Sequence, residues 1–302
     1  MNMETDLSVF VEREIGRSKR FGRRSSPKQI ALFVAALCLS LIFFFPLFYT
    51  ISSSLKEAWE IFVYPPTLLP AAPRPANYVR LFEVVPFGTW LKNTVNVVIL
   101  STLGAVISSS FAAYSFARFK YRGRDFLFVL TLATMMLPAQ VTLIPQFILF
   151  HKMGWINTIK PLWVPAWFGG GAFNIFLMRQ FFLSLPLELD EAALIDGASR
   201  FRIFSSILIP LCKPVIATMA VISFMGNWSD FMGPLIYLNS PAKFTLAIGL
   251  NYLKAVPEVQ IGERLETILM AACVLNIIPC VIIFFSAQRY FVRGIVTTGL
   301  KG

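Results

Sequence analysis

SLPLELDEAALIDGASRFRIFSSILIPLCKP, residues 184–214, is a polar stretch that separates two strongly apolar parts of the chain. Residues 187–196 have the pattern of a short amphipathic helix. Gly197 can adopt the left-handed backbone conformation that ends a helix. Ser199 can cap a second short helix, which Pro210 is expected to end. The stretch therefore predicts two short helices that meet in a bend at Gly197.

The charges of this stretch balance one another. Its acidic side chains are Glu188, Asp190, Glu191 and Asp196, and the basic side chains in and beside it are Arg179, Arg200, Arg202 and Lys213. A surface that binds anionic lipid would carry a basic excess. The balance instead indicates a docking surface for another protein.

Six long runs without Asp, Glu, Lys or Arg surround this stretch. They cover residues 29–55, 93–117, 126–151, 161–178, 214–229 and 267–288. A helix needs roughly 20 apolar residues to cross the hydrocarbon core of a bilayer. The runs predict an all-α membrane protein with six transmembrane helices at about residues 30–53, 93–116, 126–148, 161–182, 214–237 and 267–289.

The composition agrees with a membrane protein. Apolar residues make up 56% of the 302 residues, charged residues make up 14%, and the mean hydropathy is +0.68. Soluble domains carry roughly 25% charged residues, so the composition argues against a soluble enzyme. The net charge of +11 comes from short basic clusters between apolar runs, and no nucleic-acid partner is expected.

Lysine and arginine set the expected orientation. With six spans, the side that carries both termini has 18 basic residues and the opposite side has 9. The positive-inside rule therefore places both termini in the cytoplasm. The expected organisation is a basic cytoplasmic segment at 1–28, a transmembrane domain at 29–291 and a cytoplasmic tail at 292–302. The Gly-rich, polar tail is not expected to continue the last helix.

A longer pattern within the polar stretch resembles a known family. Glu191-Ala192-Ala193 is followed after three residues by Gly197, and after nine more by Ile207-Leu208-Ile209-Pro210. Permeases of ABC importers carry this pattern, with Leu where this chain has Ile209. The segments at 112–124, 136–145, 173–182 and 289–302 resemble the carbohydrate branch, and within it the second permease subunit of maltose-type systems. The resemblance implies the type I ABC importer transmembrane fold.

The resemblance also implies partners and site residues. Residues 184–211 would be the coupling loop, which contacts an ATPase through Glu191, Ala192, Ala193, Asp196, Gly197, Ile207 and Pro210. The expected partners are a homologous permease, two ATPase subunits, an extracytoplasmic solute-binding protein and the lipid bilayer. Tail residues Gly299, Lys301 and Gly302 would enter the ATPase interface. ATP and Mg would bind the ATPase subunits, and no cofactor is expected in this chain. Gly294 and Gly299 have P-loop spacing, but Leu300 stands where a P-loop requires Lys.

Polar residues inside the predicted spans are candidates for the substrate pathway. They are Gln140, Asn174, Asn227, Trp228, Asp230 and Asn276. Amides both donate and accept hydrogen bonds, which suits sugar hydroxyls, and an indole ring can stack on a ligand. The alternative role for each is a hydrogen bond between helices. Gly104, Ser108 and Ala112 recur every four residues and predict a close helix-packing stripe rather than a site.

The leading hypothesis is a sugar importer subunit of the cell membrane, and two other functions stay open. An ABC permease for glycerol phosphate or another polyol would share the coupling loop. An ion-coupled secondary carrier usually needs titratable groups inside the membrane, and Asp230 is the one candidate. A membrane enzyme is disfavoured because His151 is the sole histidine and no span holds paired carboxylates. Selection of one sugar is expected to rest largely on the binding protein and partner permease.

Overall fold

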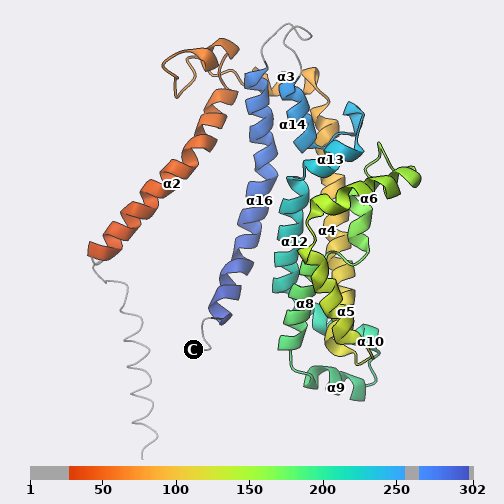
Figure 1. Ribbon diagram of the computed structural model, residues 1–302. Coiled ribbons are helices and arrows are strands. Elements are labelled where there is room, and N and C mark those ends of the chain that lie inside the picture. Colours follow the sequence, from red (N-terminus) through yellow and green to blue (C-terminus); the bar gives the residue numbers. More distant parts are fainter. Residues whose placement is uncertain (1–26, 256–264, 299–302) are drawn as a thin grey trace, which may run out of the picture. The chain divides into compact units, whose positions relative to one another are not determined.

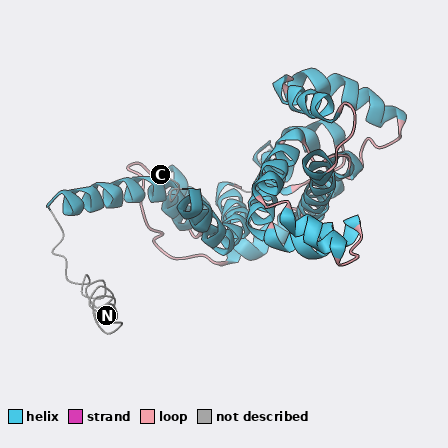
Figure 2. Cartoon of the chain, turned by 90° about the horizontal axis from the view of Figure 1, so that it is seen from below, coloured by secondary structure: helices cyan, strands magenta, loops and turns pink. Residues whose placement is uncertain are grey.

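The computed structural model describes residues 27–255 and 265–298, and the last ten of these as backbone only. The described residues form helices, turns and loops, without a strand (Figure 2). The elements are α2 Pro27–Ser54, η2 Ala58–Phe62, α3 Ala76–Val84, α4 Phe87–Arg118, α5 Arg124–Ala133, η3 Thr134–Met136, α6 Ala139–Lys152, α7 Lys160–Trp163, η4 Val164–Trp167, α8 Ala172–Ser184, α9 Glu188–Ile195, α10 Arg200–Arg202, η5 Ile203–Leu208, α11 Ile209–Leu211, α12 Lys213–Trp228, α13 Met232–Tyr237, η6 Pro241–Lys243, α14 Leu246–Ala255 and α16 Glu266–Thr298 (Figure 1).

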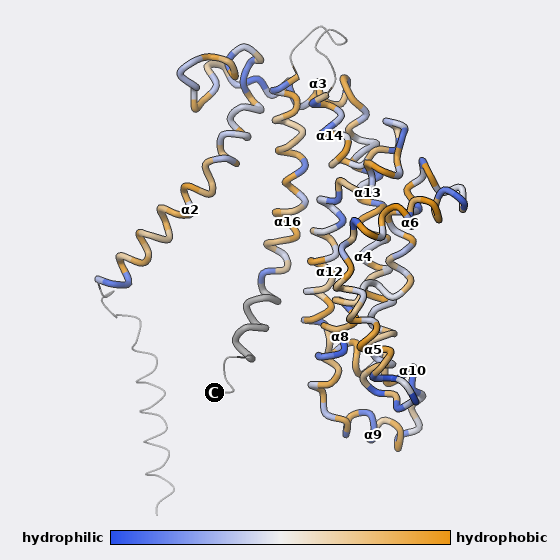
Figure 3. Tube along the Cα trace, in the orientation of Figure 1, coloured by the Kyte–Doolittle hydropathy of each residue, from blue (hydrophilic) through white to orange (hydrophobic). Residues whose placement is uncertain are grey.

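The chain divides into two units, one ending at Thr50 and the other beginning at Ile51. The first unit holds most of α2, a 28-residue helix of strongly apolar side chains (Figure 3). At 1.5 Å per residue such a helix is about 42 Å long, which exceeds the roughly 30 Å of bilayer hydrocarbon. The helix therefore has the length and composition of a membrane anchor.

Three helices of the described residues have the length and composition to cross a membrane. They are α2, α4 and α16, and the count rises to as many as five if each of two bent helix pairs forms one span. These three helices cover the predicted spans at 30–53, 93–116 and 267–289. The predicted count of six spans stays a prediction.

The predicted third span, residues 126–148, is broken rather than continuous. Helix α5 and the short η3 end at Met136, and α6 starts at Ala139 after a bend of 99°. Pro138 lies in the break, where its missing N–H and fixed φ favour a helix start rather than a helix interior. A count of uncharged residues cannot register such a break.

The predicted fourth span, residues 161–182, is also interrupted. Residues 160–167 form two short helical turns, Gly169, Gly170 and Gly171 all have positive φ, and α8 follows with 13 residues. Hydroxyls of α4 bind the irregular backbone: Ser101 Oγ donates to Leu162 O at 3.0 Å and Ser108 Oγ donates to Ala166 O at 2.9 Å. Non-helical backbone at membrane depth needs such internal partners.

These contacts confirm the predicted packing stripe on α4. A Cβ atom built on Gly104 would lie 2.5 Å from the Trp167 ring, and the Trp167 indole N–H donates to Leu100 O at 3.1 Å. Gly104 and Ser108 therefore pack against η4, as expected for small residues that let another chain segment approach closely, and Ala112 packs against the buried cluster that contains Ala113 and Tyr114.

The last two spans also differ from their predicted bounds. The fifth, residues 214–237, is split because α12 ends at Trp228 and α13 starts at Met232. The sixth continues past residue 289, since α16 extends to Thr298. The prediction that the tail at 292–302 leaves the helix was therefore wrong over residues 292–298. Extending an existing helix needs no new nucleus, which offsets the roughly 1 kcal/mol cost of Gly294. Tail candidates Gly299, Lys301 and Gly302 lie outside the described residues.

Two buried apolar clusters hold the second unit together, and α4 contributes to both. One contains Phe87, Trp90 and Val98 of α4 with residues of α14 and α16. The other contains Ala113, Tyr114 and Ala117 of α4 with residues of α8, η5 and α12. Helix α4 therefore connects the two buried clusters of this unit.

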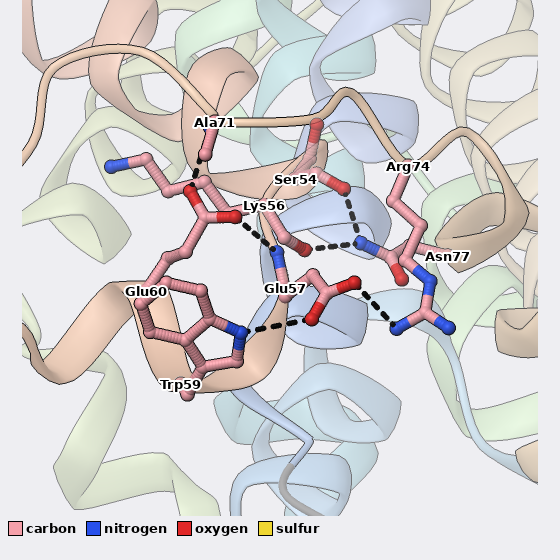
Figure 4. Close-up of polar contacts among 8 residues, drawn as sticks. All are labelled: Ser54, Lys56, Glu57, Trp59, Glu60, Ala71, Arg74 and Asn77. Carbon is pink, nitrogen blue, oxygen red and sulfur yellow. Dashed lines mark hydrogen bonds and ion pairs between the residues drawn. The ribbon is translucent and has the colours of Figure 1, made fainter.

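Hydrogen bonds order the proline-rich loop between α2 and α4. The Asn77 side-chain amide donates to Ser54 O and to Lys56 O, both at 2.9 Å, and Glu60 Oε2 accepts from the Ala71 backbone N–H at 3.0 Å (Figure 4). Glu60 is 4% exposed. The sequence predicted an irregular loop here, and the structure adds η2 and α3, which this network holds in place.

Candidate functional site

The predicted bend at Gly197 is present. Helix α9 spans Glu188–Ile195, close to the predicted 187–196, and Gly197 has φ of +78°. Ser199 Oγ accepts a hydrogen bond from the Arg202 backbone N–H at 3.3 Å, which confirms it as the cap of α10. The two helices lie together at one end of the second unit, next to the end of α4 (Figure 1).

The second helix is longer and less regular than expected. It continues from α10 through a π-helical segment at Ile203–Leu208 into α11, and it ends at Leu211, one residue after Pro210. A proline ring clashes with the carbonyl four residues earlier in a regular α-helix. Pro210 avoids this position because it lies in the first turn of α11, directly after the π-helical segment, where a helix tolerates proline.

Most of the predicted docking residues face outward. Glu191, Ala192, Asp196, Gly197 and Pro210 are exposed, Ile207 is half-buried and Ala193 is buried at 7% exposure. Ala193 therefore packs inward and anchors α9 to its own chain.

Sequence reasoning missed the apolar part of this surface. Leu187, Ile195 and Phe201 are exposed by 56%, 87% and 66%. Large apolar side chains that remain exposed on a polar loop are typical of a protein interface. The available signal was their position on the polar side of two amphipathic helices.

The structure also pairs Asp190 with a residue outside the loop. Arg118, the last residue of α4, places its Nε 3.1 Å from Asp190 Oδ2, and the two side chains are 2% and 7% exposed. Arg118 Nη2 donates a hydrogen bond to Leu185 O at 3.1 Å. From the sequence, we expected the charge of Asp190 to be balanced by a basic residue within or beside the loop. Its partner instead precedes the loop by about seventy residues.

Two more contacts connect the loop and its flanks to neighbouring helices. Tyr114 of α4 donates its hydroxyl hydrogen to Arg200 O at 3.3 Å. The Arg179 guanidinium lies 4.1 Å from the centre of the Phe128 ring, and its Nε donates to Phe116 O at 3.3 Å. The loop is therefore held to α4, and its flanking residue Arg179 is held to α4 and α5.

Cys212, between α11 and α12, offers a test of this packing. Its side chain is fully buried, and burial raises the pKa of the thiol to about 12. Thiolate is the reactive form, so the buried thiol is almost entirely unreactive near neutral pH. We expect Cys212 to resist alkylation in the folded protein. Mass spectrometry after iodoacetamide treatment with and without denaturant measures this, and equal labelling would contradict the burial.

Three pathway candidates lie together at the contact between α12 and α16. The Trp228 indole N–H donates to Asn276 O at 3.2 Å, and the Trp228 ring stacks on Phe224 at a centroid distance of 5.4 Å. Asn227 donates to Ser223 O at 2.6 Å. Trp228 and Asn227 thus use donors within the chain, whereas Asn276 Oδ1 is buried and has no hydrogen-bond partner among the described residues.

The other candidates lie elsewhere. Gln140 is exposed on α6, and Asp230 accepts from the Gly233 backbone N–H at 3.2 Å in the break between α12 and α13. Asn174 is 9% exposed and donates to Gly170 O at 2.8 Å, while its Oδ1 has no partner among the described residues. The six candidates do not form one cluster in this chain.

The long apolar helices and the broken spans are typical of an integral membrane protein. Residues 86–297 match the family model of the binding-protein-dependent transport system inner membrane component. The chain belongs to this family of ABC importer permeases. Its fold is the type I ABC importer transmembrane fold, and its location is the membrane.

Curated relatives match over most of their length. The arabinooligosaccharides transport system permease protein AraQ of Halalkalibacterium halodurans is 34% identical over 87% of this chain and 93% of its own. The trehalose/maltose transport system permease protein MalG of Thermococcus litoralis is 32% identical over 91% and 98%. These matches confirm the carbohydrate branch predicted from the sequence.

A solved structure supports the same fold. One chain of a bacterial ABC transporter involved in the import of the acidic polysaccharide alginate superposes with a TM-score of 0.79 and 27% sequence identity. The superposition covers 89% of this chain and 99% of that chain. The broken third, fourth and fifth spans therefore belong to a chain whose overall arrangement matches an importer permease.

Proposed function

We propose that this chain is the permease subunit of an ATP-driven importer for a sugar or oligosaccharide. The observation that carries the proposal is the loop at 184–211, where two short helices bend at Gly197 and present exposed Glu191 beside exposed apolar side chains. The chain's membership of the importer permease family and the sugars named for its relatives support the substrate class.

The chain provides a passage and a docking surface, and a partner provides the energy. ATP and Mg bind the partner ATPase subunits, which hydrolyse ATP. Small Ala192 permits close approach of that ATPase, and exposed Glu191 can form a charge-assisted bond to a basic side chain on it. Two ATPase subunits, a homologous permease and an extracytoplasmic solute-binding protein complete the importer.

The pathway is proposed to run between this chain and the homologous permease. Gln140 on the exposed face of α6 and the unpartnered amide oxygens of Asn174 and Asn276 are the candidates in this chain. Asn227, Trp228 and Asp230 surround the break after α12. Amides suit sugar hydroxyls because they donate and accept hydrogen bonds. The oxygens of Asn174 and Asn276 are buried within this chain, so a sugar reaches them only when the surrounding helices separate.

The test of the proposal is transport by the assembled importer. The chain is expressed with its neighbouring importer genes, and the purified complex is reconstituted with its binding protein in liposomes. We expect uptake of the sugar that co-purifies with the binding protein when ATP is enclosed on the ATPase side. Uptake that follows an ion gradient and ignores ATP would instead favour a secondary carrier.

Orientation is tested separately. The basic cluster at 118–124 is proposed to be cytoplasmic, and both termini with it. In intact cells we expect a cysteine at Arg122 to resist a membrane-impermeant maleimide and a cysteine at Ala72 to react. Both side chains are exposed in the structure, so access depends on the membrane side. Labelling of both positions after permeabilisation is the control, and strong labelling at Arg122 in intact cells would reverse the topology.

A further inference from the structure

Helix α4 is bonded to chain segments at both of its ends. At its C-terminal end, Arg118 pairs with Asp190 of α9 and Tyr114 donates to Arg200 O. At its N-terminal end, Trp90 Nε1 donates to Pro241 O at 2.8 Å, and the Leu246 backbone N–H donates to Thr94 Oγ1 at 2.8 Å. One helix therefore contacts both the proposed ATPase-docking loop and the segment 241–246.

The hold on that distant segment is extensive. Asn93 Nδ2 donates to Ala242 O at 3.1 Å and to Phe244 O at 3.0 Å. Trp90 is fully buried, so its indole donor has no access to water as an alternative partner. From Thr94 to Arg118 the helix rises about 36 Å at 1.5 Å per residue, which is enough to cross the bilayer hydrocarbon of about 30 Å.

The contact between α4 and the docking loop is a buried ion pair. Arg118 and Asp190 are 2% and 7% exposed, whereas the neighbouring Glu188 and Glu191 on α9 are exposed. A buried pair is often no more stabilising than apolar packing of similar volume, but removing one partner leaves a costly unpaired charge. The pair therefore fixes the position of α9 against α4 more than it raises the free energy of unfolding.

The geometry of the pair leaves room for adjustment. Arg118 Nε lies 3.1 Å from Asp190 Oδ2, close enough for an ion pair, yet the groups are not aligned for a hydrogen bond. Neither Asp190 oxygen has a hydrogen-bond partner among the described residues. A carboxylate can accept two parallel bonds from one guanidinium. A small rotation of α9 would therefore change this pair from a loose contact to a bidentate one.

We propose that the ion pair between Arg118 and Asp190 is an adjustable contact through which α4 transmits movement from the ATPase-docking loop to segment 241–246. Movement of α9 by the ATPase tightens the pair and displaces α4 along with the segment held by Trp90, Asn93 and Thr94. Arg118 and Asp190 act as positioning residues in this step. The inference rests on the proposed function, because it takes α9 as the element that the ATPase moves.

The experiment measures whether ATPase closure reaches segment 241–246. Ala242 is exposed, so a cysteine there can be labelled with a maleimide in the purified complex in nanodiscs, without nucleotide or trapped with Mg·ATP and orthovanadate. The complex without the introduced cysteine is the blank. We expect the labelling rate to change about fivefold or more on trapping, the lower range of coupling between distant sites.

The variants test whether the ion pair transmits movement or only supports binding of the ATPase. Asp190→Asn is expected to retain the ATPase in the purified complex and to lose most of the labelling change, and Arg118→Lys is expected to lose part of it. The charge-swapped pair Arg118→Asp with Asp190→Arg is expected to regain part of the change. Asp125→Asn, an exposed carboxylate outside the docking loop whose only ion pair in the described residues is with Arg124, is the matched control and should behave as the parent.

Each result has one meaning. A parent complex that retains no ATPase would refute the proposed function itself. If Asp190→Asn and Arg118→Lys retain the ATPase and show an unchanged labelling response, the proposed role of the ion pair is refuted and the proposed function is not. Loss of the ATPase from Asp190→Asn but not from Asp125→Asn would show that the pair determines docking, which would also contradict the transmission of movement through α4.

Discussion

Replacement of Gly170 by alanine is expected to destabilise the protein by about 3 kcal/mol or more, within the range of severe single substitutions. The added Cβ would lie 2.2 Å from Ala105 O and 2.9 Å from Ala105 Cα, and these are backbone atoms of α4. A helix backbone cannot yield as a flexible side chain can. The positive φ of +65° adds a second cost for any L-residue.

Gly123→Ala is the matched control for this prediction. Gly123 is in the left-handed conformation, with φ of +83° and ψ of 0°, and has no atom within 4 Å of its built Cβ, so alanine there should cost only about 1 kcal/mol from the backbone conformation. Thermal unfolding of the two purified variants in the same detergent compares them directly. Equal losses at the two positions would show that the contact between Gly170 and α4 is absent.

Replacement of Gly197 by leucine is expected to abolish ATPase association while leaving this chain nearly intact. No atom lies within 4 Å of the Cβ built on Gly197, whose φ is +78°. Within the chain the substitution therefore costs about 1 kcal/mol of backbone strain. The new side chain would project from the exposed bend of the docking loop, where the partner ATPase is proposed to bind.

Gly154→Leu provides the comparison. Gly154 also has positive φ, +67°, and no atom near its built Cβ, but it follows α6 and is far along the chain from the docking loop. Both variants should lose similar stability, and Gly197→Leu alone should lose the ATPase on affinity purification of the complex. Glu191→Ala should weaken the same association without affecting membrane insertion. Full ATPase retention and wild-type transport in Gly197→Leu and Glu191→Ala would contradict the coupling role of the loop.

The interrupted spans explain why counting uncharged residues was an incomplete guide. Charge-free length reports whether a segment can lie in lipid, but it does not report whether the backbone stays helical. Pro138 was a visible signal for the break in the third span. The three consecutive glycines at 169–171 were a similar signal for the fourth. Ser229–Phe231 contained no comparable signal, and that break appeared only in the structure.

The pathway candidates show a second kind of limit. The amides were predicted as substrate contacts because they can donate and accept hydrogen bonds with sugar hydroxyls, and the alternative role for each candidate was a hydrogen bond between helices. Asn174 and Asn227 both donate to the carbonyl four residues earlier, but the amide oxygens of Asn174 and Asn276 are buried without a partner among the described residues. Trp228 donates to Asn276, which is 48 residues away. The sequence could not predict these last features, because contacts between distant helices have no fixed spacing along the chain.

The sequence by itself determined the helical membrane class, the family and the bend of the docking loop. Those features depend on local properties: the apolar length of a run, the left-handed conformation open to Gly197 and the capping oxygen of Ser199. Only the tertiary structure decided which distant residues contact α4. Arg118 meets Asp190, and Asn93 meets Ala242 and Phe244, across long separations in the chain. The physical reason is that burial selects these pairs: a charge or amide removed from water must find whichever partner the packing of distant helices brings to it.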